Sequence, residues 1–267
     1  MSNSQRQMDI PACLAISGVG KTFGSGAAQT QALGDIELAV REGEFLAIVG
    51  PSGCGKSTLL QIAAGLTPPT RGSVHFHGAA VTAPPPGIVY LFQQYGKSLF
   101  PWRTVLDNVA FAVEHLPGRR RAEARASSRR YLDMVGLADF ADHYPAQLSG
   151  GMQQRVTIAR ALAAQPRVLL MDEPFSSVDA LTRLELHAIV QDLWQRHRFT
   201  AVLVTHDVDE AVFLADRIAV LSGRPSRVVR VLETGLPRPR DRLETPQMPR
   251  YLELRHELLA ALLGHGA

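Results

Sequence analysis

Short apolar runs alternate with longer segments of helical periodicity along most of this chain. Continuous apolar runs at residues 45–49, 167–171 and 200–204 predict strands that are buried on both faces, as in a parallel sheet. Helices are predicted from residue 59, over 180–197 and over 207–215, and further strands at 88–92, 217–221 and 227–231. This alternation indicates an α/β fold.

The alternation of apolar runs and helical segments is interrupted in three places: before residue 45, over residues 95–160, and after residue 232. Short strands at 13–17 and 36–40, the second with clean alternation, predict an antiparallel β edge before the core. Residues 95–160 are helical in pattern and predict an inserted α-helical subdomain. We therefore expect an α/β core with its β subdomain at 1–94 and 161–232, the helical subdomain at 95–160, and a tail at 233–267 that ends in an amphipathic helix at 251–263.

The composition narrows the class of protein. The hydrophobic fraction of 46% is enough for a sizeable core, and the formal charge of +3 does not suggest a nucleic-acid partner. Cys13 and Cys54 give neither a disulfide framework nor a zinc spacing, which favours a reducing compartment. The sequence shows no signal peptide and no apolar run of membrane-spanning length, so we expect a cytosolic protein or one bound peripherally to a membrane.

A glycine-rich loop follows the apolar run at 45–49 and precedes a predicted helix. In such a loop, backbone N–H groups converge on an anion at the helix N-terminus, and phosphate is the natural ligand. Lys56 is expected to reach the β- and γ-phosphates, and the Ser57 hydroxyl is expected to bind Mg²⁺. The loop comprises Gly50, Pro51, Ser52, Gly53, Cys54, Gly55, Lys56, Ser57 and Thr58.

Two acidic residues, Asp172 and Glu173, come directly after the apolar run at 167–171. In P-loop proteins, an acid at a neighbouring strand end helps to hold Mg²⁺, and another group orients or deprotonates the attacking water. Asp172 suits the first role and Glu173 the second. The two acids and the glycine loop together predict a site for a magnesium nucleotide.

Ser149, Gly150 and Gly151 form a second short glycine-containing helix start, with Ser149 as the expected N-cap of a helix through residue 160. With this motif, which reads Leu-Ser-Gly-Gly-Met-Gln-Gln-Arg at 148–155, the sequence resembles the ATP-binding cassette (ABC) family over residues 12–232. The resemblance implies a P-loop NTPase (RecA-like) core with an antiparallel β edge and an inserted helical subdomain. It also implies ATP and Mg²⁺ as cofactors and ATP hydrolysis as the activity.

The resemblance also assigns roles to single residues. It implies Glu173 as the general base, His206 as the switch residue that holds the γ-phosphate and the base, and Gln93 as the Q-loop residue that senses Mg²⁺ and water. Gln94 is the alternative to Gln93, because the doublet leaves the register open. Phe23 is expected at a loop, where a base could stack on it, and it resembles the aromatic residue that stacks on adenine, although from the residues alone a core position is equally compatible.

ABC cassettes act as head-to-tail dimers, so the resemblance implies a second ATPase subunit, most simply a second copy of this chain. Ser149 and Gly151 would then contact the γ-phosphate that the partner holds, and Asp179 in the D-loop would couple the two sites. Met152 stands where the commonest signature has Gln. We expect little effect of this departure, because the phosphate-facing groups are the Ser149 hydroxyl and backbone N–H groups.

Residues 98–102, which end in Pro101 and Trp102, resemble the Q-loop segment of importer ATPases for sulfonates, taurine and nitrate. The resemblance implies that the region from Gln93 to Trp102 receives membrane permease subunits, that a solute-binding protein acts indirectly, and that the chain works at the cytoplasmic face of the inner membrane. The solute would be a small organic or inorganic anion. The alternatives are packing of Trp102 inside the helical subdomain, a soluble ABC ATPase uncoupled from transport, and the ATPase of an exporter.

Cys54 lies inside the predicted anion loop, near a helix N-terminus, where the pKa of a thiol tends to fall. One hypothesis is therefore a reactive thiol whose alkylation blocks ATP binding. The alternative is a small residue that fills the loop. His75 and His77 lie on one face of a predicted strand, but without a third ligand we expect an exposed face rather than a metal site.

Overall fold

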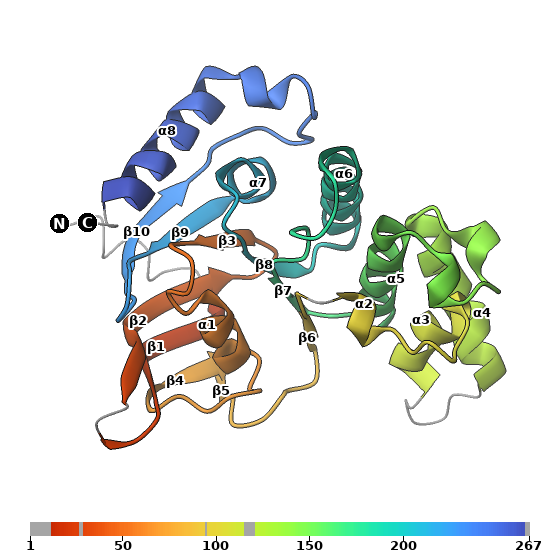
Figure 1. The fold of residues 1–267 in the computed structure, drawn as a ribbon, viewed down its shortest axis with the longest axis horizontal. Helices are drawn as coiled ribbons and strands as arrows, with labels where there is room; N and C mark the ends of the chain where they lie inside the picture. Colours follow the sequence, from red (N-terminus) through yellow and green to blue (C-terminus); the bar gives the residue numbers. More distant parts are fainter. Residues whose placement is uncertain (1–11, 27–28, 94, 115–120, 265–267) are drawn as a thin grey trace. The chain divides into compact units, whose positions relative to one another are not determined.

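The computed structural model describes residues 12–26, 29–93, 95–114 and 121–264 (Figure 1). The chain divides into two compact units, one formed by residues 1–86 with 199–267 and the other by residues 87–198. Both are mixed α/β structures, as the sequence pattern predicts. Within the described residues, no helix combines the length and the apolar character that crossing a membrane requires.

The first unit contains an antiparallel sheet of four strands in the order β2-β1-β4-β5. The strands are β1 (Ala12–Phe23), β2 (Thr30–Arg41), β4 (Arg71–Phe76) and β5 (Ala79–Ala80). The predicted antiparallel edge is therefore a separate sheet, and β1 and β2 extend well beyond the two expected segments. Register shifts along the β1–β2 pairing explain the difference, because each shift interrupts the alternation by which strands are recognised.

The same unit holds four strands in the order β10-β9-β3-β8. Strand β3 (Phe45–Val49) is parallel to β8 (Thr200–Val204) and to β9 (Arg217–Leu221), whereas β10 (Val228–Glu233) is antiparallel to β9. Strands β3, β8 and β9 are buried at every position, which explains their continuous apolar runs. The helices of this unit are α1 (Lys56–Ala63), α7 (Val208–Leu214) and α8 (Pro249–Gly264), with a 3₁₀ turn at Thr245–Gln247.

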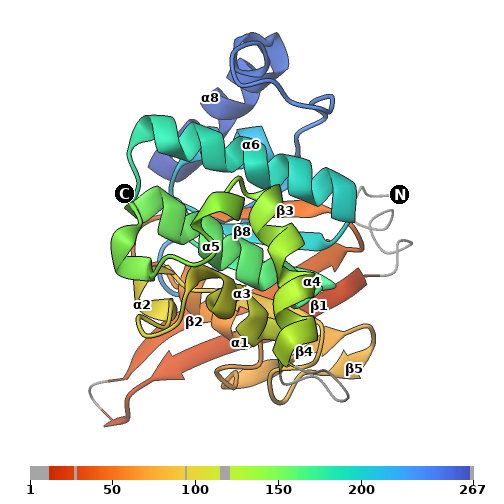
Figure 2. The same ribbon diagram turned by 90° about the vertical axis from the view of Figure 1, so that its right-hand side faces the viewer.

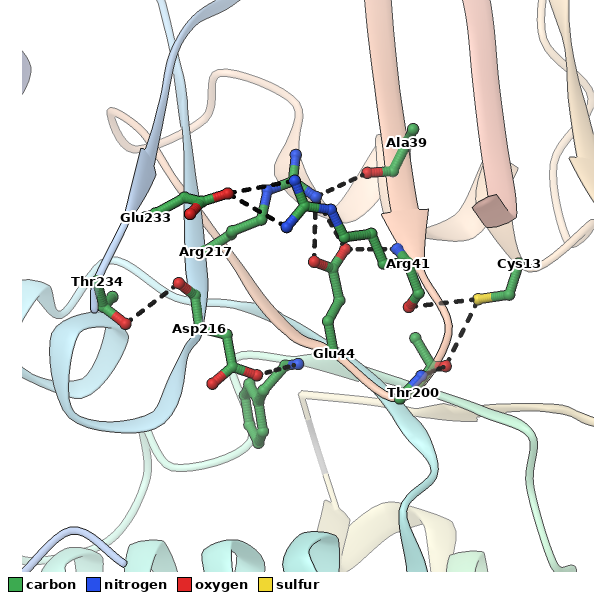
Figure 3. Close-up of polar contacts among 11 residues, drawn as sticks. Cys13, Ala39, Arg41, Glu44, Thr200, Asp216, Arg217, Glu233 and Thr234 are labelled. Carbon is green, nitrogen blue, oxygen red and sulfur yellow. Dashed lines mark hydrogen bonds and ion pairs between the residues drawn. The ribbon is translucent and has the colours of Figure 1, made fainter. Parts of the chain in front are cut away.

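A buried ion pair lies among the strands of the first unit (Figure 3). Arg217 on β9 donates to the carboxylate of Glu44 at 3.0 Å and to the carbonyl of Ala39 on β2 at 3.2 Å. Burial raises the pKa of Glu44, and the Arg41 backbone N–H and the charge of Arg217 oppose that shift. Removal of one partner would leave an uncompensated buried charge, and the contact of Arg217 with the carbonyl of Ala39 links β9 to β2.

The second unit contains the parallel pair β6 (Ile88–Leu91) and β7 (Val168–Asp172). Its helices are α2 (Tyr95–Ser98), α3 (Val105–Glu114), α4 (Arg121–Met134), α5 (Gly150–Ala163) and α6 (Ala180–His197), with 3₁₀ turns at Ala138–Phe140 and Pro145–Gln147. Helices α3, α4 and α5 pack against one another (Figure 2) through small and apolar side chains that include Ala110, Val113 and Ala124. Ser149 is the N-cap of α5, which confirms that prediction.

Candidate functional site

The glycine loop joins β3 to α1 in the first unit. Gly53 and Gly55 have φ values of 70° and 115°, which other residues rarely adopt. A Cβ on Gly55 would lie 2.9 Å from the side chain of Leu33. Gly55 is the N-cap of α1 and supplies no side-chain hydrogen bond to that helix end, where the positive end of the helix dipole favours an anion.

Lys56 is buried beneath this loop. Its ammonium group donates to the carbonyls of Gly50 at 2.8 Å and Pro51 at 3.0 Å, so the charge is held against the start of the loop. A concave backbone with left-handed glycines, an uncapped helix start and a lysine charge is what a polyphosphate requires. The residues of the loop therefore fit the triphosphate of a nucleotide.

Ser226 supports the loop through a hydrogen bond to its backbone, and no sequence motif would have identified this residue. Its buried hydroxyl lies 2.7 Å from the carbonyl of Cys54 and 3.1 Å from that of Ala32. The side chain of Arg224, from the same turn between β9 and β10, comes within 3.7 Å of the position that a Cβ on Gly53 would occupy. The β9–β10 turn thus supports the glycine loop and adds a positive charge beside it.

The hypothesis of a reactive Cys54 is wrong in its premise. Cys54 is 2% exposed, and burial raises the pKa of its thiol, although the charge of Lys56 acts in the opposite direction. The cost of desolvating a thiolate outweighs its stabilisation by the nearby positive charge, so the Cys54 thiol stays protonated at neutral pH. The alternative, a small side chain that fills the loop, agrees with the structure.

The acid pair lies at the end of β7 in the second unit. Asp172 is the last residue of this strand, it is buried, and its carboxylate accepts a hydrogen bond of 2.8 Å from the hydroxyl of Tyr90 on β6. Glu173 has a φ of 43°, in the left-handed region that is costly for a residue with a side chain. The amide of Gln93, just beyond β6, donates to the Glu173 carboxylate at 3.1 Å.

These contacts bring together three of the predicted site residues, Gln93, Asp172 and Glu173, at the carboxyl ends of two parallel strands. Sequence reasoning missed Tyr90, whose only signal was an aromatic hydroxyl on a strand that ends beside the site. The alternative Q-loop residue, Gln94, lies outside the described residues.

Ser149 is the N-cap of helix α5, and its hydroxyl accepts a hydrogen bond of 3.3 Å from the backbone of Met152. A Cβ on Gly151 would lie 2.4 Å from the methyl group of Thr182 on α6, so this position has room only for glycine. Asp179 is the N-cap of α6, and its carboxylate accepts the Thr182 hydroxyl at 2.6 Å. That bond, with the helix N–H groups, lowers the pKa of Asp179. Gly150 lies between Ser149 and Gly151 as the first residue of α5.

His206 and Phe23 both belong to the first unit. His206 is exposed between β8 and Asp207, which is the N-cap of α7. Phe23 is the last residue of β1 rather than part of a loop. Its side chain is 46% exposed, which excludes the alternative that it is buried in the hydrophobic core. The ammonium of Lys21 lies 5.1 Å from the centre of its ring.

His77 is exposed, and the described residues contain no cluster of three metal-ligating side chains.

A groove of about 370 Å³ lies within the second unit. Its lining comes from β6, from the segment around Ser98 and Phe100, from α3 and from α5, and is largely apolar. Arg160 on α5 donates to the carbonyl and hydroxyl of Ser98 at 2.7 and 2.8 Å, which joins α5 to the segment that follows β6. Gln154 also lines the groove, with both polar side-chain atoms buried and unpaired.

A phosphate loop between a buried strand and a helix, together with an acid pair at the end of a buried parallel strand, defines a P-loop nucleotide-binding protein. A family model described as "ABC transporter" matches residues 33–176, more than half of the 267 residues. The chain therefore belongs to the ABC transporter family.

Two relatives and one solved structure illustrate the relationship. The chain is 47% identical over 249 residues to the nitrate import ATP-binding protein NrtC and, to the same extent, to the bicarbonate transport ATP-binding protein CmpC, both of Synechococcus elongatus. Each match covers 92% of this chain but only 38% and 37% of the respective relative. The ATP-binding cassette MJ0796, a dimer in a post-hydrolysis state with ADP and Pi, matches 82% of this chain and 98% of its own, with 34% identity and a TM-score of 0.73.

Proposed function

We propose that this chain is the ATP-hydrolysing, nucleotide-binding subunit of an ABC importer for a small anion. The observation that carries the proposal is the Gln93–Glu173 hydrogen bond at the end of a buried strand, in a chain whose glycine loop fits a triphosphate. A carboxylate held by an amide in a strained backbone conformation is suited to orient and deprotonate water. The family match to an ABC transporter model supports this reading.

Each predicted residue has a role in this proposal. The loop from Gly50 to Thr58 binds the phosphates, with Lys56 on the β- and γ-phosphates, and Phe23 stacks on adenine. A Mg²⁺ ion bound with the nucleotide would neutralise the charge that develops on the phosphate oxygens. Ser57, Gln93 and Asp172 are the residues that would hold it.

Glu173 accepts the proton of the attacking water, and the Gln93 amide keeps the carboxylate in place through the bond at 3.1 Å. His206 holds the γ-phosphate and the base. Catalysis then consists mainly of positioning and of neutralising charge.

The working unit in this proposal is a head-to-tail dimer, in which Ser149 and Gly151 of one subunit contact the γ-phosphate on the other and Asp179 couples the two sites. The dimeric state of the MJ0796 cassette supports a dimer as the working unit. We also propose the division into a core at 1–94 and 161–232, a helical subdomain at 95–160 and a tail at 233–267. An isolated monomer should hydrolyse ATP poorly.

The membrane permease is proposed to contact the region from Gln93 to Trp102 at the cytoplasmic face of the membrane. Trp102 is 72% exposed, which argues against the alternative that it only packs the helical subdomain. The apolar groove beside this segment supports a protein partner. The equal identity to a nitrate and a bicarbonate protein supports an anion but does not choose between solutes. The solute-binding protein would select it.

The test is co-purification of the tagged chain from its native membrane in mild detergent, with ATP hydrolysis measured on the same sample. We expect a hydrophobic permease subunit in the complex and a hydrolytic rate that Lys56→Ala abolishes. Recovery of soluble partners alone would favour the alternative of an uncoupled ABC ATPase. Outward transport of the solute in vesicles would favour the exporter.

A further inference from the structure

Helix α7 is short and begins immediately after the residue proposed as the switch. It has seven residues, Val208–Leu214, and Asp207 caps it by accepting the backbone N–H of Glu210 at 3.1 Å. A helix of this length is not stable on its own. On the other side of His206, the Thr205 N–H donates to the carbonyl of Ile48 on β3 at 3.2 Å. His206 is therefore held between β3 and α7, and whatever fixes α7 also fixes His206.

The tail supplies the partners for the C-terminal end of α7. The last four carbonyls of a helix have no partner within it. Here Arg240 donates to the carbonyls of Val212, Phe213 and Ala215 at 3.3, 2.8 and 2.9 Å, and Arg238 donates to that of Leu214 at 2.7 Å. Two side chains of one short segment thus pair with the last three carbonyls of α7, while the carbonyl of Ala211 accepts the backbone N–H of Ala215.

Arg240 is deeply placed for a charged residue. Its side chain is 1% exposed, and it also donates to the hydroxyl of Thr234 at 3.1 Å. Burial lowers its pKa to about 9, so the guanidinium remains a cation at neutral pH. A cation at a helix C-terminus is stabilised by the helix dipole, so the guanidinium of Arg240 is favoured at this end of α7.

The other end of α7 is held by α8, which packs against it (Figure 1). The hydroxyl of Tyr251 donates to the backbone carbonyl of Asp209 at 3.0 Å and to its carboxylate at 3.2 Å. Tyr251 is buried, and burial together with the charge of Asp209 raises its pKa, so the hydroxyl stays a donor. Arg255 pairs with the same carboxylate at 3.1 Å, but both side chains are about half exposed, so that pair adds little.

We propose that residues 234–255 position His206 by holding α7 at both ends, with Tyr251 and Arg240 as the positioning residues. The proposal rests on the proposed role of His206 in ATP hydrolysis. The contacts reach α7 from opposite ends of one continuous tail segment, so a change in the tail moves the helix start that carries His206. The tail would then set the rate of the chemical step without touching the nucleotide.

Tyr251→Phe tests this, because it keeps the buried ring and removes only the hydroxyl. We expect kcat for ATP hydrolysis to fall roughly three- to tenfold, since a small misplacement of a catalytic group is costly, with KM for ATP unchanged within about twofold. In a His206→Ala background the same substitution should cause no further fall. The matched control is Glu257→Ala on α8, which removes an ion pair of 3.2 Å to Arg230 on β10 and should leave kcat unchanged.

Hydrogen exchange of the amides at 207–211 gives a second readout, and Arg240→Lys a second variant. Both Tyr251→Phe and Arg240→Lys should speed exchange there. If Tyr251→Phe lowers kcat equally with and without His206, its role is structural and the proposal is overturned. If His206→Ala is slow but Tyr251→Phe matches the wild type, the positioning role fails while the proposed function stands. If His206→Ala hydrolyses ATP as fast as the wild type, the role of His206 itself fails.

Discussion

The side-chain amide of Gln93 donates a hydrogen bond of 3.1 Å to the carboxylate of Glu173. The two residues follow the adjacent parallel strands β6 and β7, so their side chains meet at the same end of the pair. Glu173 reaches this position with a φ of 43°, a conformation that costs of the order of 1 kcal/mol or more for a residue with a Cβ. Backbone strain of this kind is common at active sites, which supports the proposed role of the Glu173 carboxylate.

Replacement of Glu173 by Gln tests its role as the base. The amide is nearly isosteric and its carbonyl can still accept the bond from Gln93, so ATP binding should persist while hydrolysis falls by roughly 10²- to 10⁴-fold. A nucleotide-bound dimer should accumulate, which gel filtration with bound-nucleotide analysis would measure. Glu185→Gln on α6, whose carboxylate pairs with Arg155, is the control and should hydrolyse ATP normally. Unaltered turnover in Glu173→Gln would remove Glu173 as the base.

The hydroxyl of Tyr90 orients Asp172 through a hydrogen bond of 2.8 Å, and Tyr90→Phe removes that bond while keeping the ring. If Asp172 holds the metal ion, loss of its supporting donor should weaken metal binding about tenfold. Electron paramagnetic resonance of Mn²⁺ titrated into the ATP complex measures this directly. Tyr131→Phe on α4, whose hydroxyl accepts from Arg130, is the control. Equal Mn²⁺ affinity in the wild type and Tyr90→Phe would show that Tyr90 does not support a metal ligand.

Some parts of the candidate site are predictable from the sequence because they depend on neighbouring residues. The glycine loop, the strand before it and the Ser149 N-cap are local features, and their residue types follow from backbone geometry. The Tyr90–Asp172 and Ser226–Cys54 bonds join residues 82 and 172 positions apart. No local pattern encodes such a pairing, because only the order of the strands brings the residues together.

Other differences have separate physical causes. Phe23 was expected in a loop, but register shifts in β1 hide the alternation that marks a strand. The thiol of Cys54 was expected to be acidic because its neighbours are positive, and burial proved the larger effect. Whether a group is desolvated depends on elements distant in the sequence, here the β9–β10 turn with Ser226. The domain boundaries and the roles of the site residues stay predictions.

Both cysteines should resist modification in the folded protein. Cys13 and Cys54 are each 2% exposed, and burial raises the pKa of both thiols. Since the thiolate is the reactive form, reaction with Ellman's reagent at neutral pH should be slow, should accelerate as the pH rises well above neutrality, and should reach two thiols per chain only after unfolding in denaturant. Absorbance at the thionitrobenzoate band measures the rate. Rapid modification of one thiol in the native protein would contradict the burial of that residue.

Trp102 lies on the surface proposed to contact the permease, whereas Asn108 supports the loop that carries Trp102. The buried amide of Asn108 accepts the Phe100 N–H at 2.8 Å and donates to the carbonyls of Phe100, Arg103 and Thr104 at 3.0 to 3.2 Å, which shapes the loop that presents Trp102. Asn108→Ala should lower the free energy of unfolding by about 1–3 kcal/mol, because buried backbone groups lose their partners, and should lower solute uptake.

Trp102→Ala should change the free energy of unfolding by less than about 0.5 kcal/mol, since the indole is 72% exposed, and should leave the basal ATPase of the isolated subunit intact. Uptake of the solute into cells or vesicles should nevertheless fall, because the substitution removes an aromatic anchor from the proposed permease contact. Leu263→Ala removes a similarly exposed apolar side chain from the first unit, outside residues 234–255, and serves as the control, with normal uptake expected. If Trp102→Ala transports solute as well as that control does, the exposed indole is not part of the contact with the permease.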